Sequence, residues 1–350
     1  MSVTNVTEKK SVSSGPKRNT NIVRLILEGR AFFALIVIIA VFSFLSPYYF
    51  TLNNFLIMAS HVAIFGILAI GMLLVILNGG IDLSVGSTLG LAGCIAGFLM
   101  QGVTLTYFGV ILYPPVWAVV VITCALGALV GAVNGVLIAY LKVPAFVASL
   151  GVLYVARGIA LLMTNGLTYN NLGGRPELGN TGFDWLGFNR LAGIPIGVIV
   201  LAVLAIICGI VLSRTAFGRW LYASGGNERA ADLSGVPVKR VKIIVYVLSG
   251  VCAAIAGLVL SSQLTSAGPT AGTTYELTAI AAVVIGGAAL TGGRGTVRGT
   301  MLGAFVIGFL SDGLVIIGVS AYWQTVFTGA VIVLAVLMNS IQYGRRVKSS

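Results

Sequence analysis

The chain alternates long apolar runs with short polar breaks over most of its length. Ten of these runs approach or exceed the length that a helix needs to cross the ~30 Å hydrocarbon core of a bilayer. They occupy residues 31–49, 54–78, 83–101, 113–140, 145–165, 193–213, 243–262, 275–290, 299–317 and 322–342. The pattern predicts an all-α, polytopic membrane protein with about ten transmembrane helices. The third and eighth runs are rich in glycine and polar residues, so we expect them to be short or broken.

The composition agrees with lipid as the main solvent. Hydrophobic residues make up 58% of the chain and charged residues only 9%, whereas a soluble protein carries roughly 25% charged residues. The 46 glycines in 350 residues are typical of membrane helices that approach one another closely. Because the cysteines lie in apolar runs without CxxC spacing, we expect buried thiols and neither disulfides nor metal ligands. These cysteines are Cys94, Cys124, Cys208 and Cys252.

The basic residues predict the orientation. With the N-terminus in the cytoplasm, the segments on the inside hold eighteen of the 21 Lys and Arg, and the outside loops hold only Arg175 and Arg190. The inside segments are 1–30, 79–82, 141–144, 214–242, 291–298 and 343–350. We therefore predict cytoplasmic tails at 1–30 and 343–350 flanking a transmembrane domain at 31–342. The formal charge of +12 follows from this orientation, so no nucleic-acid partner is expected.

A polar segment at 214–242 interrupts the apolar chain on the predicted cytoplasmic side. Asn227 is a good N-cap, and Glu228 stands in the first turn, where a negative charge suits the helix dipole. Gly235 and Pro237 end the helix. The pattern predicts a short, capped, basic helix that protrudes from the membrane and docks on another protein. The helix lies between the cap at Asn227 and the stop at Gly235.

The break NGGIDLSVGS, from Asn78 to Ser87, places irregular backbone and the acid Asp82 near the membrane boundary. Irregular backbone at this depth is tolerated where protein or a water-filled cavity surrounds it. In one interpretation the break is a gate or path element with Asp82 as a hydrogen-bond hub. In the other it is a tight interfacial turn in which Asp82 caps a helix. The sequence leaves both open.

Few other ionisable residues fall within the apolar runs. Three positions are open for Arg157: it lines the path, it snorkels toward the outer surface, or it pairs with a buried acid. The candidate acids are Asp312 and Glu276. We favour the pairing with an acid, which is a structural role. Glu276 alternatively complements a helix dipole or contacts a ligand at the outer mouth. Asp312 and His61 are interpreted as structural residues.

Several classes of protein are disfavoured by what the sequence lacks. It has no cluster with metal-ligand spacing, no recognisable nucleophile and base, and no nucleotide-binding GxxxxGK[ST] loop. The break GGRGTVRG at 292–299 has the character of an anion nest, but an inside turn with orienting charges is simpler. We therefore expect a transport protein without a cofactor or metal of its own, and not an enzyme.

Four separated motifs carry a family resemblance. They are GGIDLSVGS, NGVLIAYLKVPAFVASLGVLYVARGIALLMTNG, GNERAADLSGVPVKRVKIIVYVLSG and YELTAIAAVVIGGAALTGGRGTVRGTMLGA. Together they resemble the membrane-permease subunit of bacterial ABC sugar importers, the ribose/xylose/galactose-type branch, which is related to branched-chain amino-acid permeases. The resemblance covers about residues 31–342. The segment TTYELT at 273–278 departs from the family pattern, which has a Gly before the Tyr.

The resemblance implies a permease in the bacterial cytoplasmic (inner) membrane that translocates a pentose, hexose or polyol. Its implied partners are a second permease copy or paralogue, a cytoplasmic ABC ATPase that uses the ATP, and a periplasmic or extracellular sugar-binding protein. The resemblance also implies a coupling helix after the sixth span, formed by Gly226, Asn227, Glu228, Arg229, Ala230, Ala231 and Asp232. A neutral polyol needs weak hydroxyl contacts, which makes Asn78, Ser84, Thr164 and Asn165 candidates for the translocation path, beside Asp82, Arg157 and Glu276. The alternative is a stand-alone channel or secondary carrier for a small polar solute.

Overall fold

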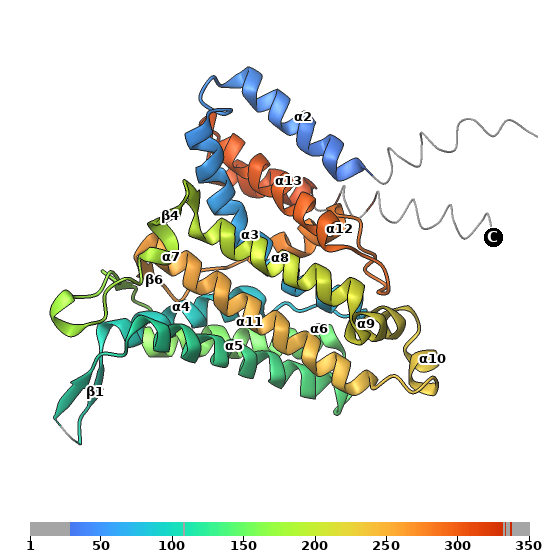
Figure 1. The fold of residues 1–350 in the computed structure, drawn as a ribbon, viewed down its shortest axis with the longest axis horizontal. Coiled ribbons are helices and arrows are strands. Elements are labelled where there is room, and N and C mark those ends of the chain that lie inside the picture. Colours follow the sequence, from blue (N-terminus) through green and yellow to red (C-terminus); the bar gives the residue numbers. More distant parts are fainter. Residues whose placement is uncertain (1–28, 108, 332, 334–336, 338–350) are drawn as a thin grey trace, which may run out of the picture.

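The computed structural model describes residues 29–107, 109–331, 333 and 337 (Figure 1). Nearly all of the tail at 1–30, the tail at 343–350 and the end of the tenth apolar run lie outside the described residues. The described chain is predominantly helical, as the apolar pattern predicts.

Nine of the ten apolar runs contain one helix each. These are α2 (Arg30–Leu45), α3 (Leu52–Leu77), α4 (Val85–Gln101), α5 (Val116–Ala139), α6 (Ala145–Thr164), α8 (Ile196–Arg214), α11 (Val238–Leu264), α12 (Tyr275–Ile285) and α13 (Val297–Ile316). The tenth run is helical over 321–331. Six of these helices, namely α3, α5, α6, α8, α11 and α13, are long and apolar enough to cross a membrane. The third and eighth runs form the shorter helices α4 and α12, as their composition predicts.

The strands are short and lie in loops. β1 (Val103–Leu105) pairs with β2 (Val110–Leu112), and β4 (Arg190–Leu191) pairs with β5 (Ile194–Pro195), both antiparallel. β3 (Tyr169–Asn170) pairs with β6 (Ser266–Ala267), also antiparallel. The loop at 166–192 also contains the 3₁₀ helix η1 (Pro176–Leu178) and the short helix α7 (Trp185–Phe188). The β3–β6 pair fastens this loop to the chain that follows α11.

The helix α3 lies at the centre, with α8, α11, α12 and α13 packed around it. Most of its side chains from Met58 onward are buried. The helix α11 packs on α3, α4 and α5. It approaches α5 at backbone distance, because a Cβ atom added to Gly131 would lie 2.1 Å from the carbonyl oxygen of Tyr246. This close approach is the use of glycine that the composition predicts.

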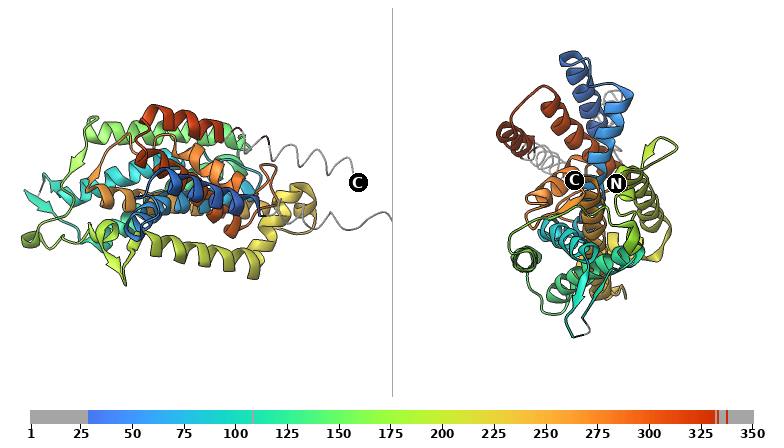
Figure 2. Two further views of the ribbon diagram at one scale, coloured as in Figure 1. Left: turned by 90° about the horizontal axis from the view of Figure 1, so that it is seen from above. Right: turned by 90° about the vertical axis from the view of Figure 1, so that its left-hand side faces the viewer.

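The loops gather at two opposite ends of the molecule. Figure 1 shows the polar segment of 214–242 at one end, and β1, β4 and β6 at the other. The view along the long axis in Figure 2 shows the helices grouped around this axis. The side of the membrane that each end faces stays a prediction. The cysteines are free thiols and are buried or half-buried, which confirms that prediction.

Candidate functional site

The polar segment at 214–242 folds into two helices joined at an elbow. The first, α9 (Ala216–Gly226), is capped by Thr215, whose hydroxyl accepts a hydrogen bond from the backbone N–H of Gly218. The second, α10 (Glu228–Leu233), is capped by Asn227, whose Oδ1 accepts from the N–H of Ala230 at 3.0 Å. The predicted cap is therefore confirmed. The predicted start of the helix at Gly226 is wrong, because Gly226 is the last residue of α9.

The helix α10 ends at Leu233, just before the stop that its sequence predicts. Gly235 has φ +84°, which a glycine adopts without the steric cost of a Cβ atom. Pro237 then precedes α11, where its missing N–H costs no helical hydrogen bond. The short helix stands out from the bundle: Arg229, Ala230 and Asp232 are exposed, and the apolar Leu233 is 83% exposed. The exposed face of α10 is the kind of surface that a protein partner covers.

The base of this elbow contacts two other segments at backbone distance. The N–H of Gly293 donates to the carbonyl of Leu77, the last residue of α3, at 2.9 Å. A Cβ atom on Gly225 of α9 would lie 1.7 Å from that same carbonyl oxygen. We call Leu77, Gly225, Gly292 and Gly293 the glycine junction. Any displacement of α9 must therefore act directly on the end of α3 and on the turn before α13.

Two side-chain hydrogen bonds support the glycine junction. The Tyr222 hydroxyl donates to the Gly295 carbonyl at 2.9 Å, and the Asn78 amide donates to the Ser224 hydroxyl at 3.0 Å. Burial, with a smaller contribution from Cys208, raises the pKa of the Tyr222 phenol above its usual value, so it remains a neutral donor. Residues 292–296 of this break form a turn packed on α9, and 297–299 begin α13; that the turn lies on the inside stays a prediction.

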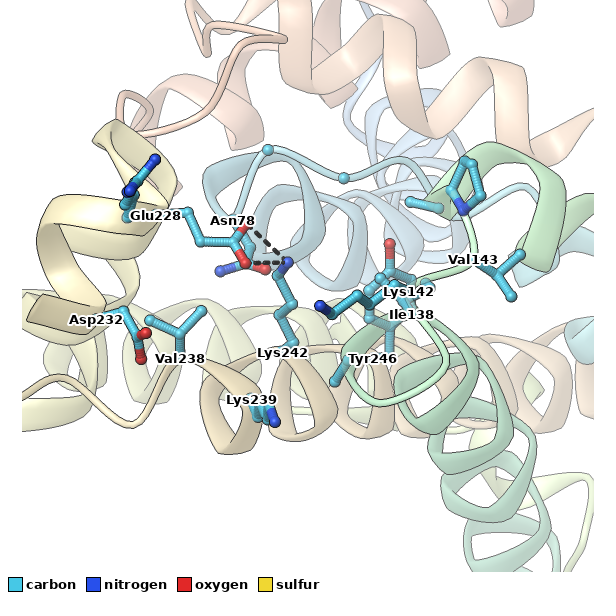
Figure 3. Close-up of a pocket in the computed structure, with 16 residues that line it drawn as sticks. Asn78, Ile138, Lys142, Val143, Glu228, Asp232, Val238, Lys239, Lys242 and Tyr246 are labelled. Atoms are coloured by element: carbon cyan, nitrogen blue, oxygen red, sulfur yellow. Dashed lines mark hydrogen bonds and ion pairs between the residues drawn. The ribbon is translucent and has the colours of Figure 1, made fainter.

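A cavity of about 760 Å³ lies beside α10 (Figure 3). On one side Glu228 and Lys242 form an ion pair, with Nζ at 2.7 and 2.8 Å from the two carboxylate oxygens. This pair ties α10 to the first turns of α11. The remaining charged side chains at the cavity are Lys142, Arg229, Asp232 and Lys239. The cavity therefore joins α10, α11, the end of α3 and the α5–α6 loop in one polar region.

Asp82 is the centre of a buried hydrogen-bond network deeper in the same end. Its Oδ1 accepts from the Ser84 N–H at 3.0 Å and the Ser84 hydroxyl at 2.6 Å, and its Oδ2 accepts from the Ser249 hydroxyl at 3.0 Å. The Asn134 amide donates to the Ser84 hydroxyl at 2.8 Å. The network joins the α3–α4 loop to α5 and α11. Asp82 is therefore the predicted hydrogen-bond hub, while Ser84 occupies the N-cap position of α4.

The other predicted path residues lie elsewhere. Thr164 is buried and donates to the Ala160 carbonyl at 2.9 Å, and Asn165 ends α6 in the left-handed conformation, with φ +50°. Arg157 donates to the carbonyls of Pro269 and Ala271, in the loop before α12. The predicted path residues therefore take part in different hydrogen-bond networks, while Glu276 and Arg157 both approach α4, at Gly86 and Gly90; their role in a path stays a prediction.

The structural pair predicted for Arg157 is partly wrong. Its hydrogen-bond partners are the two carbonyls, and Glu276 adds an electrostatic interaction. Asp312 instead accepts a hydrogen bond from His61, which makes the His61–Asp312 pair a feature that the sequence did not predict. Sequence reasoning also missed Asn134, Ser249 and Tyr222. Asn134 and Ser249 are isolated polar residues in apolar runs, and Tyr222 lies in the polar segment 214–242.

Comparison with known proteins gives a consistent family. The chain matches the family described as "Branched-chain amino acid transport system / permease component" over residues 54–336. It is 42% identical to the ribose import permease protein of Escherichia coli strain K12, over 90% of this chain and 94% of that protein. The ribose import permease protein of Bacillus subtilis strain 168 is 43% identical, over 88% and 91% of the two chains. The xylose transport system permease protein of E. coli strain K12 is 35% identical, over 83% and 86%. No solved structure matched the chain.

Proposed function

Because the chain belongs to the family of branched-chain amino acid transport system permease components, we propose that it is the membrane subunit of an ATP-driven sugar importer. The observation that carries the proposal is the 42% and 43% identity to two ribose import permeases over about nine-tenths of this chain. The relative at 35% identity is a xylose permease. Ribose and xylose are neutral aldopentoses, so an aldopentose is the proposed substrate class.

The elbow of α9 and α10 supports a coupling role. Residues 226–232 form its tip, where the exposed side chains of α10 are free to bind a cytoplasmic ATPase. Force on α10 reaches α11 through the ion pair of Glu228 and Lys242, and reaches α3 through the glycine junction. ATP is used on the partner, and this chain converts the movement into a change of helix packing that opens the path to the other side.

The remaining parts follow from this assignment. Two permease copies, or one copy and a paralogue, would enclose the path, with ten spans in each and both termini in the cytoplasm. A binding protein would deliver the sugar to the opposite end, where Glu177 and Asp184 are exposed in the loop at 166–192. These two acids are suited to basic residues of that partner. The permease would lie in the bacterial cytoplasmic membrane as a multi-pass protein.

The predicted path residues take different parts in this proposal. Asp82 and Ser84 hold the α3–α4 loop in place, and Asn78 holds α9, so these residues would position the inner end of the path. Arg157 and Glu276 would shape the loop before α12 at its outer end. Thr164 and Asn165 would lie at the outer end of α6.

Uptake of radiolabelled pentoses tests the proposal. The chain is expressed with its ATPase and binding protein in a strain that lacks pentose transport. We expect ATP-dependent uptake that is lost when residues 227–233 are replaced by Gly-Ser while the permease remains in the membrane. The same chain is reconstituted alone in liposomes. Uptake there, without the ATPase, would establish a stand-alone carrier and refute the proposal.

A further inference from the structure

One stripe of α3 stays open from the first turn of the helix as far as Phe65, because Asn53, Ile57 and His61, four residues apart, are exposed. Between residues 62 and 78 every position is buried except Phe65, which is half-buried. His61, one turn earlier, has a side chain that is 49% exposed. Residues four apart lie on the same face of a helix. His61 and Phe65 therefore form the inner end of this opening in the packing around α3.

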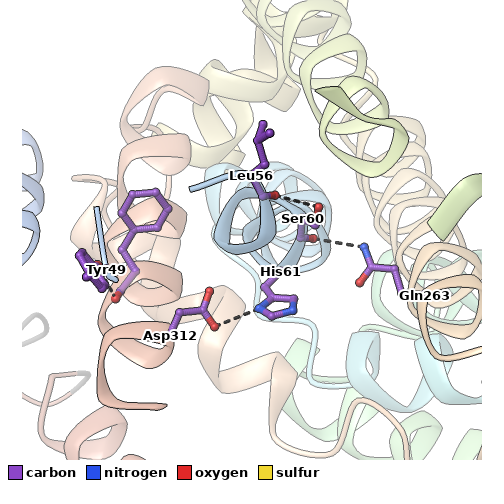
Figure 4. A network of polar contacts seen from close by, with 7 residues as sticks. Tyr49, Leu56, Ser60, His61, Gln263 and Asp312 are labelled. Atoms are coloured by element: carbon purple, nitrogen blue, oxygen red, sulfur yellow. Dashed lines mark hydrogen bonds and ion pairs between the residues drawn. The ribbon is translucent and has the colours of Figure 1, made fainter. Parts of the chain in front are cut away.

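Two further side chains border this opening, from two other helices. Asp312 of α13 accepts a hydrogen bond from His61, with 3.0 Å between Nδ1 and Oδ1 (Figure 4). The ring of Tyr275, at the start of α12, lies against Phe65 with 4.8 Å between ring centroids. We call His61, Phe65, Tyr275 and Asp312 the α3 window. It joins a polar pair to an aromatic pair.

The polar pair lies toward one end of the bundle. His61 is nine residues from the start of α3, which is about 14 Å along the helix, and about 24 Å from the other end. Asp312 is four residues before the end of α13, and Tyr275 is the first residue of α12. An ionisable side chain costs a few kcal/mol in lipid and nearly always faces protein or a water-filled cavity. The His61 side chain is half-exposed in the single chain, so we expect it to face either protein or a water-filled cavity in the assembled transporter.

We propose that the α3 window lines the translocation path and contacts the transported solute, a neutral polyhydroxylated molecule of the sugar type. This inference rests on the proposed function. Asp312 holds the Nδ1–H of His61, so the Nε2 atom, for which the described residues provide no hydrogen-bond partner, is left to bind a solute hydroxyl. The C–H groups of a sugar ring pack on the electron-rich face of the aromatic pair.

The small number of contacts suits transport. A path site must bind the solute well enough to admit it and weakly enough to release it. One imidazole nitrogen and an aromatic face meet that requirement, because a single hydrogen bond and a single packing contact hold a neutral solute only weakly. The window also differs from the hub at Asp82, whose side chain is closed off by its own chain at 1% exposure.

Thiol labelling of the assembled transporter tests whether water reaches the window. The four native cysteines are replaced by alanine in a background that still transports, and His61→Cys is compared with Val203→Cys. Val203 lies in the middle of α8 and is 48% exposed, so it matches His61 in exposure but is predicted to face lipid. A charged, water-soluble methanethiosulfonate should modify His61→Cys at least about tenfold faster, since only hydrated thiols ionise. The transported pentose should slow that reaction.

Transport measurements test the contact itself. His61→Leu should lower maximal uptake about three- to tenfold, the value of one lost hydrogen bond. His61→Gln should keep most of it, because an amide can replace the imidazole as a hydrogen-bonding group. Ser60→Ala, in the same turn, should match the wild type, because the Ser60 hydroxyl bonds only within α3. Membrane content is measured for each variant, and if His61→Leu is absent from the membrane, the labelling result decides.

The inference is overturned if His61→Cys is inert, if it forms a disulfide with a second copy, or if His61→Leu transports at the wild-type rate. An inert thiol would mean that protein covers the window, and a disulfide would place it in the contact between copies. Failure of the proposed function gives a different result, because the wild-type complex itself would then take up no pentose.

Discussion

Adding one methyl group at Gly225 should separate α9 from α3. The Cβ atom of Gly225→Ala would lie 1.7 Å from the Leu77 carbonyl oxygen and 2.7 Å from the Gly293 nitrogen, both backbone atoms. Ordinary contact begins at 3.4 Å, so the Cβ atom and the carbonyl oxygen must separate by about 1.7 Å more. Overpacking of this kind costs roughly 1–3 kcal/mol. If the movement also breaks the bond from Gly293 to Leu77, a buried carbonyl loses its partner at about 1–3 kcal/mol more.

Gly226→Ala is the matched control. It is the next residue of α9, and a Cβ atom there meets no heavy atom within 4 Å. Both substitutions gain about the same helix propensity, so their difference isolates the contact with Leu77. Thermal unfolding of the purified permease is followed with a dye that fluoresces on reaction with exposed thiols, because the native cysteines are buried or half-buried. We expect the midpoint of Gly225→Ala to fall several degrees below that of Gly226→Ala. Equal midpoints would refute the glycine junction.

The other predictions concern the same end of the molecule. Tyr222→Phe removes the hydrogen bond to Gly295 and should lower the free energy of unfolding by about 1 kcal/mol, measured by the same thermal assay against Tyr107→Phe on the exposed β1–β2 turn. Asn227→Ala removes the cap of α10; coupled uptake should fall at unchanged membrane content, whereas Asn227→Ser should restore it. Asp82→Ala leaves Ser84 and Ser249 without their acceptor and should lower the free energy of unfolding by several kcal/mol. Ser249→Ala should lower it far less. Comparable unfolding midpoints for the two variants would contradict the hub. The coupling energy of Glu228 with Lys242 should stay below about 1 kcal/mol, because Glu228 is 57% exposed; a double-mutant cycle at low and high salt measures it.

Much of the fold could be predicted from the sequence. Apolar runs longer than a bilayer is thick admit only helices in lipid, which accounts for the nine runs that match helices with defined bounds and for the short α4 and α12. The family resemblance drawn from four motifs is confirmed by relatives that align over most of the chain. Capping is equally local, so Asn227 and Gly235 were predicted correctly. The helix α9 was missed, since its mixed polar and apolar residues resemble a loop.

The candidate site was harder to predict, because its contacts join residues far apart in the chain. Arg157 was expected to pair with an acid, but its guanidinium donates hydrogen bonds to two loop carbonyls, those of Pro269 and Ala271. His61 was interpreted as an isolated packing residue, and nothing in the sequence near position 61 points to Asp312. The hydrogen-bond partners of the other path candidates likewise depend on the position of each helix in the bundle.

The sequence by itself determined the helices of the apolar runs, the cap of α10 and the family, because hydrophobic length, capping residues and motifs are properties of the chain itself. The tertiary structure alone decided the glycine junction, the partners of the predicted hub at Asp82 and the α3 window. Each of these depends on how closely two or more helices approach, and that distance is set by the packing of the whole bundle.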